Sequence, residues 1–309
     1  MSNICLGTDN YGNAWGCDEP TAHKILGMAL DGGINFVDTS DSYNEGRSES
    51  MIGNYLTNSR RRNNVVLATK YRSAVGAGVN DIGASRYHIV RAVEESLRRL
   101  RTDRIDLLYC HSWDEETPIE ETLRAVDDLI HQGKVVYAGA SNFPAWVLAR
   151  SLWASDVRNL YRFEAIQSVF NILQPGLGRE MIPFAADHEL AVIPYSPLAS
   201  GYLSGKYRNN QMPKGTRIER DGEFWTRYNK HNSNKAVDAY YEISKKHGLD
   251  LAQMSLKFLE IQPFVTSVII GATTMKQLKT NVESVNIDLT DEVIKEINEV
   301  QTIYPNPCP

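Results

Sequence analysis

The amino-acid sequence predicts an α/β protein of 309 residues that folds as a single (β/α)8 TIM barrel. Eight short apolar runs rich in β-branched residues recur along the chain, as expected of buried parallel strands. No linker or low-complexity stretch divides them, so eight repeating units in one chain favour a closed barrel over a doubly wound sheet. The runs span residues 4–6, 34–37, 65–68, 105–109, 135–138, 165–166, 191–193 and 265–270.

The segments between the apolar runs show the spacing of amphipathic helices. Between the third and fourth runs, Ile89, Val93, Leu97 and Leu100 fall on one helical face. Ser85 stands just before this pattern, where a hydroxyl side chain caps free backbone N–H groups. We therefore expect strand and helix to alternate through one domain, residues 1–309.

One long segment, residues 208–232, shows neither a strand pattern nor a helix pattern. It is polar, contains Gly215 and Gly222, and follows the seventh apolar run. Loops of this length are unusual inside a compact domain and are often functional. In a barrel the segment after a strand lies at the mouth, so we expect a long loop beside the functional site.

Composition and charge exclude several classes of partner. The net charge of −5 gives no basic field, so neither nucleic acid nor an anionic membrane surface is expected to bind. No apolar run approaches the ~18 residues of a membrane span, and the N-terminus lacks a signal-peptide pattern. The four cysteines have no metal-ligand spacing, which indicates a reducing compartment and no metal site. We expect a cytoplasmic protein.

Polar side chains that can do chemistry follow successive strands. Asp38 follows the second apolar run, Lys70 the third and His111 the fourth. Each has an ordinary structural interpretation: a turn aspartate, a lysine leaving the strand into water, and a lone packed histidine. Catalytic residues of (β/α)8 enzymes lie at these strand ends, so the joint placement favours a catalytic group.

These three residues form a coherent acid–base device with Tyr43. Free tyrosine has a pKa of about 10 and is a weak proton donor at neutral pH. A nearby Lys70 ammonium favours the phenolate and is expected to lower that pKa, while Asp38 holds the lysine in place. His111 can hydrogen-bond a substrate carbonyl oxygen. Together the four residues would make a coherent proton donor, with Tyr43 as the group that carries the proton.

Six motifs in this order resemble the aldo-keto reductase superfamily over nearly the whole chain. The eighth-strand motif with Gly271 and Ala272 looks like the branch that includes potassium-channel β subunits and many bacterial reductases. Channel β subunits typically carry asparagine at the histidine position, so His111 favours a working enzyme. The motifs lie at residues 36–49, 67–70, 106–111, 133–143, 195–207 and 270–281.

The resemblance implies NADPH-dependent reduction of an aldehyde, ketone or ketosugar carbonyl, with a small-molecule carbonyl compound as the partner. Asp38, Tyr43, Lys70 and His111 would form the catalytic tetrad. Residues after the fifth to eighth strands would bind the cofactor, with the Tyr195 ring stacked on the nicotinamide. The implied cofactor residues are Ser141, Asn142, Gln167, Tyr195, Ser196, Leu198, Ser200, Gly201, Lys206, Arg217, Gly271, Thr273, Gln277 and Asn281.

Four aromatic residues near the expected strand mouths are candidate walls of the substrate pocket. They are Trp15, Tyr71, Trp113 and Phe224. The tail after residue 304 is short, so we expect an open pocket with modest selectivity.

The sequence departs from the family pattern at three places. The family usually begins with a β-hairpin that closes the barrel floor, and we expect it to be absent or short here, since the first apolar run begins at Ile4. Thr280 stands where glutamate is common near the adenine. Thr273 and Thr274 stand where a basic residue often meets the 2′-phosphate. NADPH is therefore the preferred cofactor, and NADH is retained as an alternative.

The sequence leaves two other classes of function open. One is a Schiff-base lyase with Lys70 as the nucleophile. The other is a nucleotide-sensing barrel with slow turnover. A metal hydrolase has the least support, because only Asp114 stands near His111 as a second ligand. The sequence leaves the physiological substrate, the reaction direction and the oligomeric state open.

Overall fold

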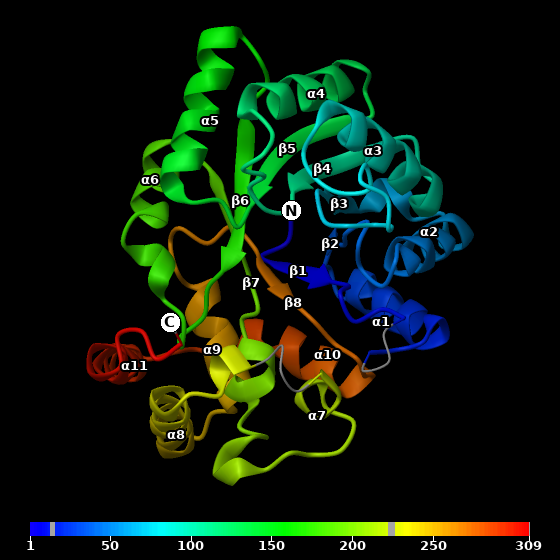
Figure 1. Cartoon of the computed structure of the whole chain (residues 1–309). Coiled ribbons are helices and arrows are strands. Elements are labelled where there is room, and N and C mark those ends of the chain that lie inside the picture. Colours follow the sequence, from blue (N-terminus) through cyan, green and yellow to red (C-terminus); the bar gives the residue numbers. More distant parts are fainter. Residues whose placement is uncertain (13–15, 222–225, 309) are drawn as a thin grey trace.

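The parallel sheet predicted from the apolar runs is present in the structure (Figure 1). The computed structural model describes residues 1–12, 16–221 and 226–308. Within that part of the chain, eight strands lie in the order β7-β6-β5-β4-β3-β2-β1-β8, and every hydrogen-bonded pair is parallel. The strands are β1 (Ile4–Gly7), β2 (Phe36–Asp38), β3 (Val66–Tyr71), β4 (Ile105–Cys110), β5 (Val135–Ser141), β6 (Phe163–Val169), β7 (Ala191–Tyr195) and β8 (Val268–Ile270).

The sheet closes on itself where the segment before β8 meets β7. Val192 and Val265 form a parallel bridge. The Thr266 N–H donates to the Val192 carbonyl oxygen at 2.8 Å, and the Val192 N–H donates to Thr266 Oγ1 at 3.2 Å. These contacts join the two ends of the strand order and confirm the (β/α)8 barrel.

Helices surround the sheet on its outer side (Figure 1). The expected helix after Ser85 is confirmed as α3, and the Ser85 side chain accepts a hydrogen bond from the His88 N–H. The helices are α1 (Glu19–Asp31), α2 (Arg47–Ser59), α3 (Arg86–Leu100), α4 (Ile119–His131), α5 (Ala145–Arg158), α6 (Met181–Asp187), α7 (Arg217–Asp221), α8 (His231–Lys246), α9 (Leu251–Glu260), α10 (Met275–Glu283) and α11 (Asp291–Ile303).

The barrel interior is filled by side chains from seven of the eight strands, all except β5. Cys5, Phe36, Ala68, Tyr109 and Ile269 belong to one buried cluster with three further inward residues. Successive residues of a strand point to opposite faces, so the next residues along face the helices instead. The inner cluster forms a packed base beneath the polar strand ends.

The floor of the barrel begins directly with β1, and no strand precedes it among the described residues. The Ser2 N–H donates to Asn35 Oδ1 at 2.8 Å, and the Ser267 hydroxyl donates to the Ser2 carbonyl oxygen at 2.9 Å. Three residues before β1 thus tie the starts of two neighbouring strands together.

The long segment after β7 is more ordered than its sequence indicates. It contains short 3-10 turns at Arg208–Asn210 and Thr226–Tyr228 and the one-turn helix α7, and α8 already begins at His231. Arg217, at the start of α7, forms an ion pair with Asp9 after β1 at 2.6 Å. The segment therefore crosses the barrel mouth from the β7 side to the β1 side.

A search of the described residues finds no helix with the length and apolarity to cross a membrane.

Candidate active site

Tyr43, Lys70 and Asp38 lie in contact at the mouth of the barrel. The Lys70 ammonium forms an ion pair with Asp38 Oδ1 and donates to the Thr39 carbonyl oxygen at 2.8 Å. The same ammonium lies 3.2 Å from the Tyr43 hydroxyl oxygen. Lys70 is fully buried and Asp38 is nearly so, which holds the chain of contacts in one geometry.

The second carboxylate oxygen of Asp38 has a partner as well. Gln167 on β6 donates from Nε2 to Asp38 Oδ2 at 2.8 Å. Gln167 was predicted to hold a nicotinamide amide; it lines the same cavity, but this N–H group is engaged by Asp38. Asp38 is thereby fixed from two sides, by a lysine and an amide, and serves as the anchor of the group.

His111 follows β4 and packs against the tyrosine. Its ring meets the Tyr43 ring edge to face, with centroids 5.8 Å apart. Its Nδ1 lies 3.3 Å from Ser40 Oγ and 3.2 Å from Ser73 Oγ. Burial, and then the charges of Lys70 and Arg72, lower the pKa of His111 to about 3. The imidazole is therefore neutral at physiological pH and can act as a hydrogen-bond partner but not as a cation.

The expected lowering of the Tyr43 pKa by Lys70 is wrong for this structure. Burial raises the pKa of Tyr43 well above 10, and the charge of Asp38 adds to the rise. The physical reason is that Lys70 is neutralised by its ion pair with Asp38, so its charge does not dominate at the phenol. Tyr43 is thus held in its protonated form before any reaction.

A cavity of about 630 Å³ opens beside these residues, within the range of small-molecule sites. Asp38, Tyr43 and His111 line one end of it. The structure also brings all fourteen residues predicted to bind the cofactor to its walls. Residues from the ends of β5, β6, β7 and β8 thus face one common space.

The loop after β7 gives the cavity a wall with unusual backbone conformations. Ser196, Ser200 and Gly201 have φ values of +55°, +57° and +98°. The Ser200 hydroxyl is buried without a hydrogen-bond partner among the described residues. Lys206 lies against Gly201, and burial together with the charge of Arg217 lowers the pKa of its ammonium. The Ser200 hydroxyl has no partner within the described part of the chain and lies on the same wall as the cations Lys206 and Arg217, so this wall fits an anionic group.

The start of α10 forms the opposite end of the cavity. Thr274 caps this helix by accepting from the Gln277 N–H. Gln277 Oε1 accepts from the Thr273 N–H at 2.7 Å and from the Thr273 hydroxyl at 2.9 Å. Lys276 lines the same wall, and the N-terminus of a helix favours negative charge. This end of the cavity also fits a phosphate.

Of the four predicted substrate residues, Trp113 and Tyr71 are described, and neither lines the main cavity. Trp113 packs edge to face on Trp146, with ring centroids 5.1 Å apart, and neither residue lines the main cavity. Tyr71 is fully buried in the core beneath the helices, because its neighbour Lys70 takes the inward direction. The prediction that Tyr71 forms a wall of the substrate pocket is therefore wrong. Trp15 and Phe224 lie outside the described residues.

Several cavity residues were missed from the sequence. Asp9 and Asn10 follow β1 and line the cavity, as does Asp250 at the start of α9. The Asn10 side chain donates to the Ala272 carbonyl oxygen, which ties the first loop to the last. The strand-end rule, applied to the first strand as to the others, would have found Asp9 and Asn10.

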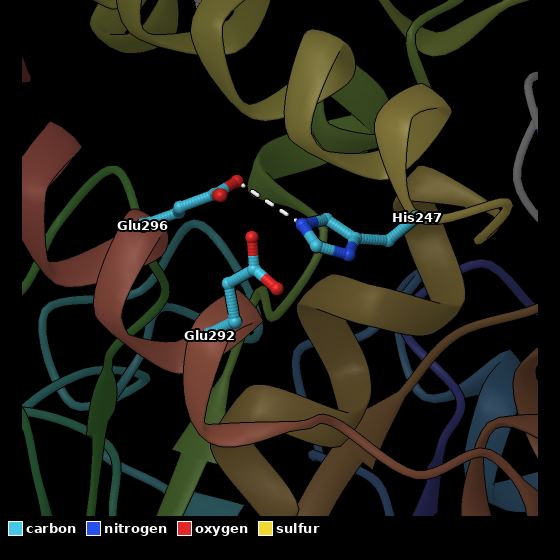
Figure 2. A group of neighbouring side chains, drawn as sticks. All are labelled: His247, Glu292 and Glu296. Atoms are coloured by element: carbon cyan, nitrogen blue, oxygen red, sulfur yellow. Dashed lines mark hydrogen bonds and ion pairs between the residues drawn. The ribbon is translucent and has the colours of Figure 1, made fainter.

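The geometry gives little support to the two other chemistries. A Schiff-base nucleophile must reach substrate as a free amine, whereas Lys70 is fully buried with its ammonium paired to Asp38. Within the described residues, only His247, Glu292 and Glu296 gather as metal ligands could, where α8 meets α11 (Figure 2). Lys246 pairs with both carboxylates, so this group is an ion-pair network.

The fold and the site together define a (β/α)8 barrel protein with a tyrosine, in contact with a buried lysine–aspartate ion pair, that faces a cavity of small-molecule size. A family model described as "Aldo/keto reductase family" matches residues 3–302. The chain belongs to the aldo/keto reductase family.

Relatives of this family align along nearly the whole chain. "Protein tas" of Escherichia coli is 34% identical over 337 aligned positions, which cover 100% of this chain and 96% of that protein. A probable voltage-gated potassium channel subunit beta of Arabidopsis thaliana is 34% identical and covers 92% of this chain and 88% of its own length. An aryl-alcohol dehydrogenase of Pestalotiopsis microspora is 30% identical and covers 97% and 78%.

Proposed function

We propose that this protein reduces the carbonyl group of an aldehyde, ketone or ketosugar to an alcohol, with NADPH as reductant and Tyr43 as general acid. The observation that carries the proposal is the contact of the Tyr43 hydroxyl with the Lys70–Asp38 ion pair at one end of the main cavity. Membership of the aldo/keto reductase family supports the reaction class.

Two features support NADPH as the reductant. The Ser200 hydroxyl, Lys206 and Lys276 supply a donor and two cations along the cavity, which suits a cofactor with several phosphates. The cavity also reaches from these groups to Tyr43 and His111. When bound, the reduced nicotinamide supplies the hydride; the protein supplies orientation and electrostatics.

Tyr43 and His111 would handle the oxygen of the substrate. His111 is neutral and would orient the carbonyl oxygen by a hydrogen bond from its ring. The oxygen becomes strongly basic as hydride reaches the carbonyl carbon, and Tyr43 would give it a proton. A raised pKa does not prevent this step, because an alkoxide is more basic than a phenolate. Lys70 lies close enough to stabilise the phenolate that remains.

The substitution Tyr43→Phe tests the proposal. It should lower kcat for NADPH-dependent reduction by roughly 100-fold or more, since general acid catalysis contributes about 10²–10⁴-fold. NADPH binding, followed by fluorescence titration, should change little. Tyr11→Phe is a matched control, because Tyr11 is fully buried, lies outside the main cavity, and its hydroxyl has no partner among the described residues.

Two outcomes would contradict parts of the proposal. Wild-type turnover in Tyr43→Phe would reject Tyr43 as the acid. Tight NADPH binding by the wild type, with no oxidation against a panel of aldehydes, ketones and ketosugars, would favour the nucleotide-sensing alternative.

A further inference from the structure

A second cavity lies behind the loop that carries Tyr43. It has a volume of about 370 Å³, and Asp41, Asp81, His88 and Arg91 contribute to its walls. Asp41 is only 2% exposed, and its Oδ2 has no hydrogen-bond partner among the described residues. One carboxylate oxygen of Asp41 therefore borders a polar space that is separate from the main cavity.

The other oxygen of Asp41 connects to the active site through one serine. Asp41 Oδ1 lies 3.2 Å from Ser40 Oγ, and Ser40 Oγ lies 3.3 Å from His111 Nδ1. The Ser42 N–H also donates to Ser40 Oγ at 3.3 Å. A single hydroxyl group thus links a buried carboxyl group to the histidine that lines the substrate end of the main cavity.

The charge of Asp41 biases the direction of each bond on this path. The Ser42 hydroxyl also lies 3.0 Å from Ser40 Oγ and can donate or accept in either state. An ionised Asp41 accepts the Ser40 O–H, so Ser40 can only accept from His111, which favours the ring proton on Nδ1. A protonated Asp41 donates to Ser40 Oγ, so the Ser40 O–H is free to donate to His111 Nδ1, and the proton resides on Nε2. Ser73 Oγ, the other neighbour of Nδ1, can donate or accept and adapts to either state.

We propose that Asp41, acting through Ser40, is a positioning residue that selects which ring nitrogen of His111 carries the proton. Only the Nε2–H form can donate a hydrogen bond to a carbonyl oxygen in the main cavity. Protonated Asp41 therefore prepares the site for carbonyl reduction, and ionised Asp41 removes the donor. The effect on turnover rests on the proposed function, whereas the effect on the imidazole does not.

The surroundings of Asp41 place its titration in the physiological range. Burial raises the pKa of Asp41 to about 7, with Glu49 on α2 adding to the rise and Arg99 on α3 opposing it. The side cavity adds further charged or titratable groups at its walls, namely Asp81, His88, Arg91 and Glu95. The pKa of His111 is about 3, so the ring stays neutral while Asp41 titrates. The titration of Asp41 can therefore change only which ring nitrogen of His111 carries the proton.

Nitrogen NMR of the protein labelled with ¹⁵N-histidine measures this directly, because the two neutral tautomers give different ring-nitrogen signals. The spectrum is recorded without cofactor, and His111→Gln identifies the His111 signals. In the wild type, the Nε2–H fraction should fall by about tenfold or more between about pH 6 and about pH 9. Asp41→Asn removes the group that titrates, so the Nε2–H fraction should be the same at both pH values. Ser40→Ala should abolish the pH response.

Asp81→Asn is the matched control, because Asp81 borders the same cavity, and no contact joins it to His111 among the described residues. This variant should keep the wild-type response. One tautomer at all pH values in the wild type, or an unchanged response in Asp41→Asn, would overturn the inference. In turnover assays, reduction by the wild type should decline above pH 7 and that by Asp41→Asn should not. A protein that reduces no carbonyl would contradict the proposed function, while the spectra would still decide this inference.

Discussion

The folded protein stabilises the protonated, uncharged form of the Asp41 carboxyl group. Its pKa is about 7 in the folded state, against a usual value of 3.8. Between these two pH values the folded chain binds more protons than the unfolded chain, so stability falls as the pH rises through this window. A shift of about three units corresponds to roughly 4 kcal/mol as an upper bound.

Asp41→Asn should therefore stabilise the protein in a pH-dependent way. The free energy of unfolding should change far less near pH 4, where the wild-type carboxyl is protonated in the folded state and only partly ionised in the unfolded state. Above pH 7 the variant should be more stable by roughly 1–4 kcal/mol. Urea denaturation at the two pH values measures the difference.

The pKa of Asp81 is shifted in the opposite direction to that of Asp41. Its hydrogen bond from Arg91 lowers its pKa, so the stability it contributes is present at neutral pH and is lost in acid. Asp81→Asn should lower stability at pH 8. An equal gain in stability for Asp41→Asn at pH 4 and pH 8 would contradict the linkage.

The proposed preference for NADPH over NADH can be tested at Lys276, near the start of α10. Thr273 and Thr274 stand where a basic residue is common, and Lys276 lines the same wall of the cavity. Lys276→Met keeps most of the side-chain length and removes the charge. It should weaken NADPH binding by about fivefold to 50-fold and leave NADH binding nearly unchanged, as measured by fluorescence titration. Lys279→Met on the exposed side of α10 is the control, and equal losses for both cofactors would contradict the assignment.

Sequence analysis identified individual residues more reliably than it predicted their electrostatics. Tyr43, Lys70, Asp38 and His111 were found because parallel strands bring their ends together in a barrel. The direction of the Tyr43 pKa shift was wrong, because the Asp38–Lys70 ion pair and the burial of the phenol depend on three-dimensional packing. The Ser40 link between Asp41 and His111 depends on side-chain directions that the sequence does not specify.

At the scale of elements, the loop after β7 forms a wall of the main cavity and holds several residues in a left-handed backbone conformation. Gly201 has a φ of +98°, and a Cβ there would lie 2.7 Å from Lys206 Cε. A side chain at this position would strain the backbone and push Lys206 away from its place.

Gly201→Ala should lower the free energy of unfolding by about 1–2 kcal/mol, since a left-handed conformation costs an ordinary residue about that much. It should also weaken NADPH binding, because Lys206 is displaced from the cavity wall. Thermal unfolding and titration measure the two effects. Gly178→Ala is the control, since a Cβ at Gly178 meets nothing within 4 Å. Equal losses in both variants would show that the cavity wall does not depend on Gly201.

Strand and helix types were predictable, but several boundaries were not. β3 extends through Thr69, Lys70 and Tyr71, beyond the apolar run, because these residues still pair with β4. A polar side chain does not prevent a residue from joining the ladder, since the hydrogen bonds come from the backbone. The sequence analysis therefore placed the end of this strand too early, before Lys70.

At the scale of the whole molecule, the number of strand–helix units was enough to identify the barrel. The closure was not readable from the sequence, because it depends on a short bridge between Val192 and Val265 and on one threonine side chain. The main cavity also belongs to the whole barrel, since its walls come from residues between Gly7 and Asn281. Most of the residues that line this cavity could be predicted from the sequence. Its extent could not, because it depends on closure of the barrel.

The four cysteines have a consequence for the chemistry that surrounds them. Cys5, Cys17, Cys110 and Cys308 are all buried as free thiols. Burial raises the pKa of each, to about 11 for Cys17 and about 12 for Cys110, so the nucleophilic thiolate is almost absent at neutral pH. Aldehydes and unsaturated ketones are electrophiles that modify thiolates. If the barrel admits such compounds, as the proposed function requires, its own sulfur atoms stay protonated and out of their reach, and the protein would resist inactivation by its substrates.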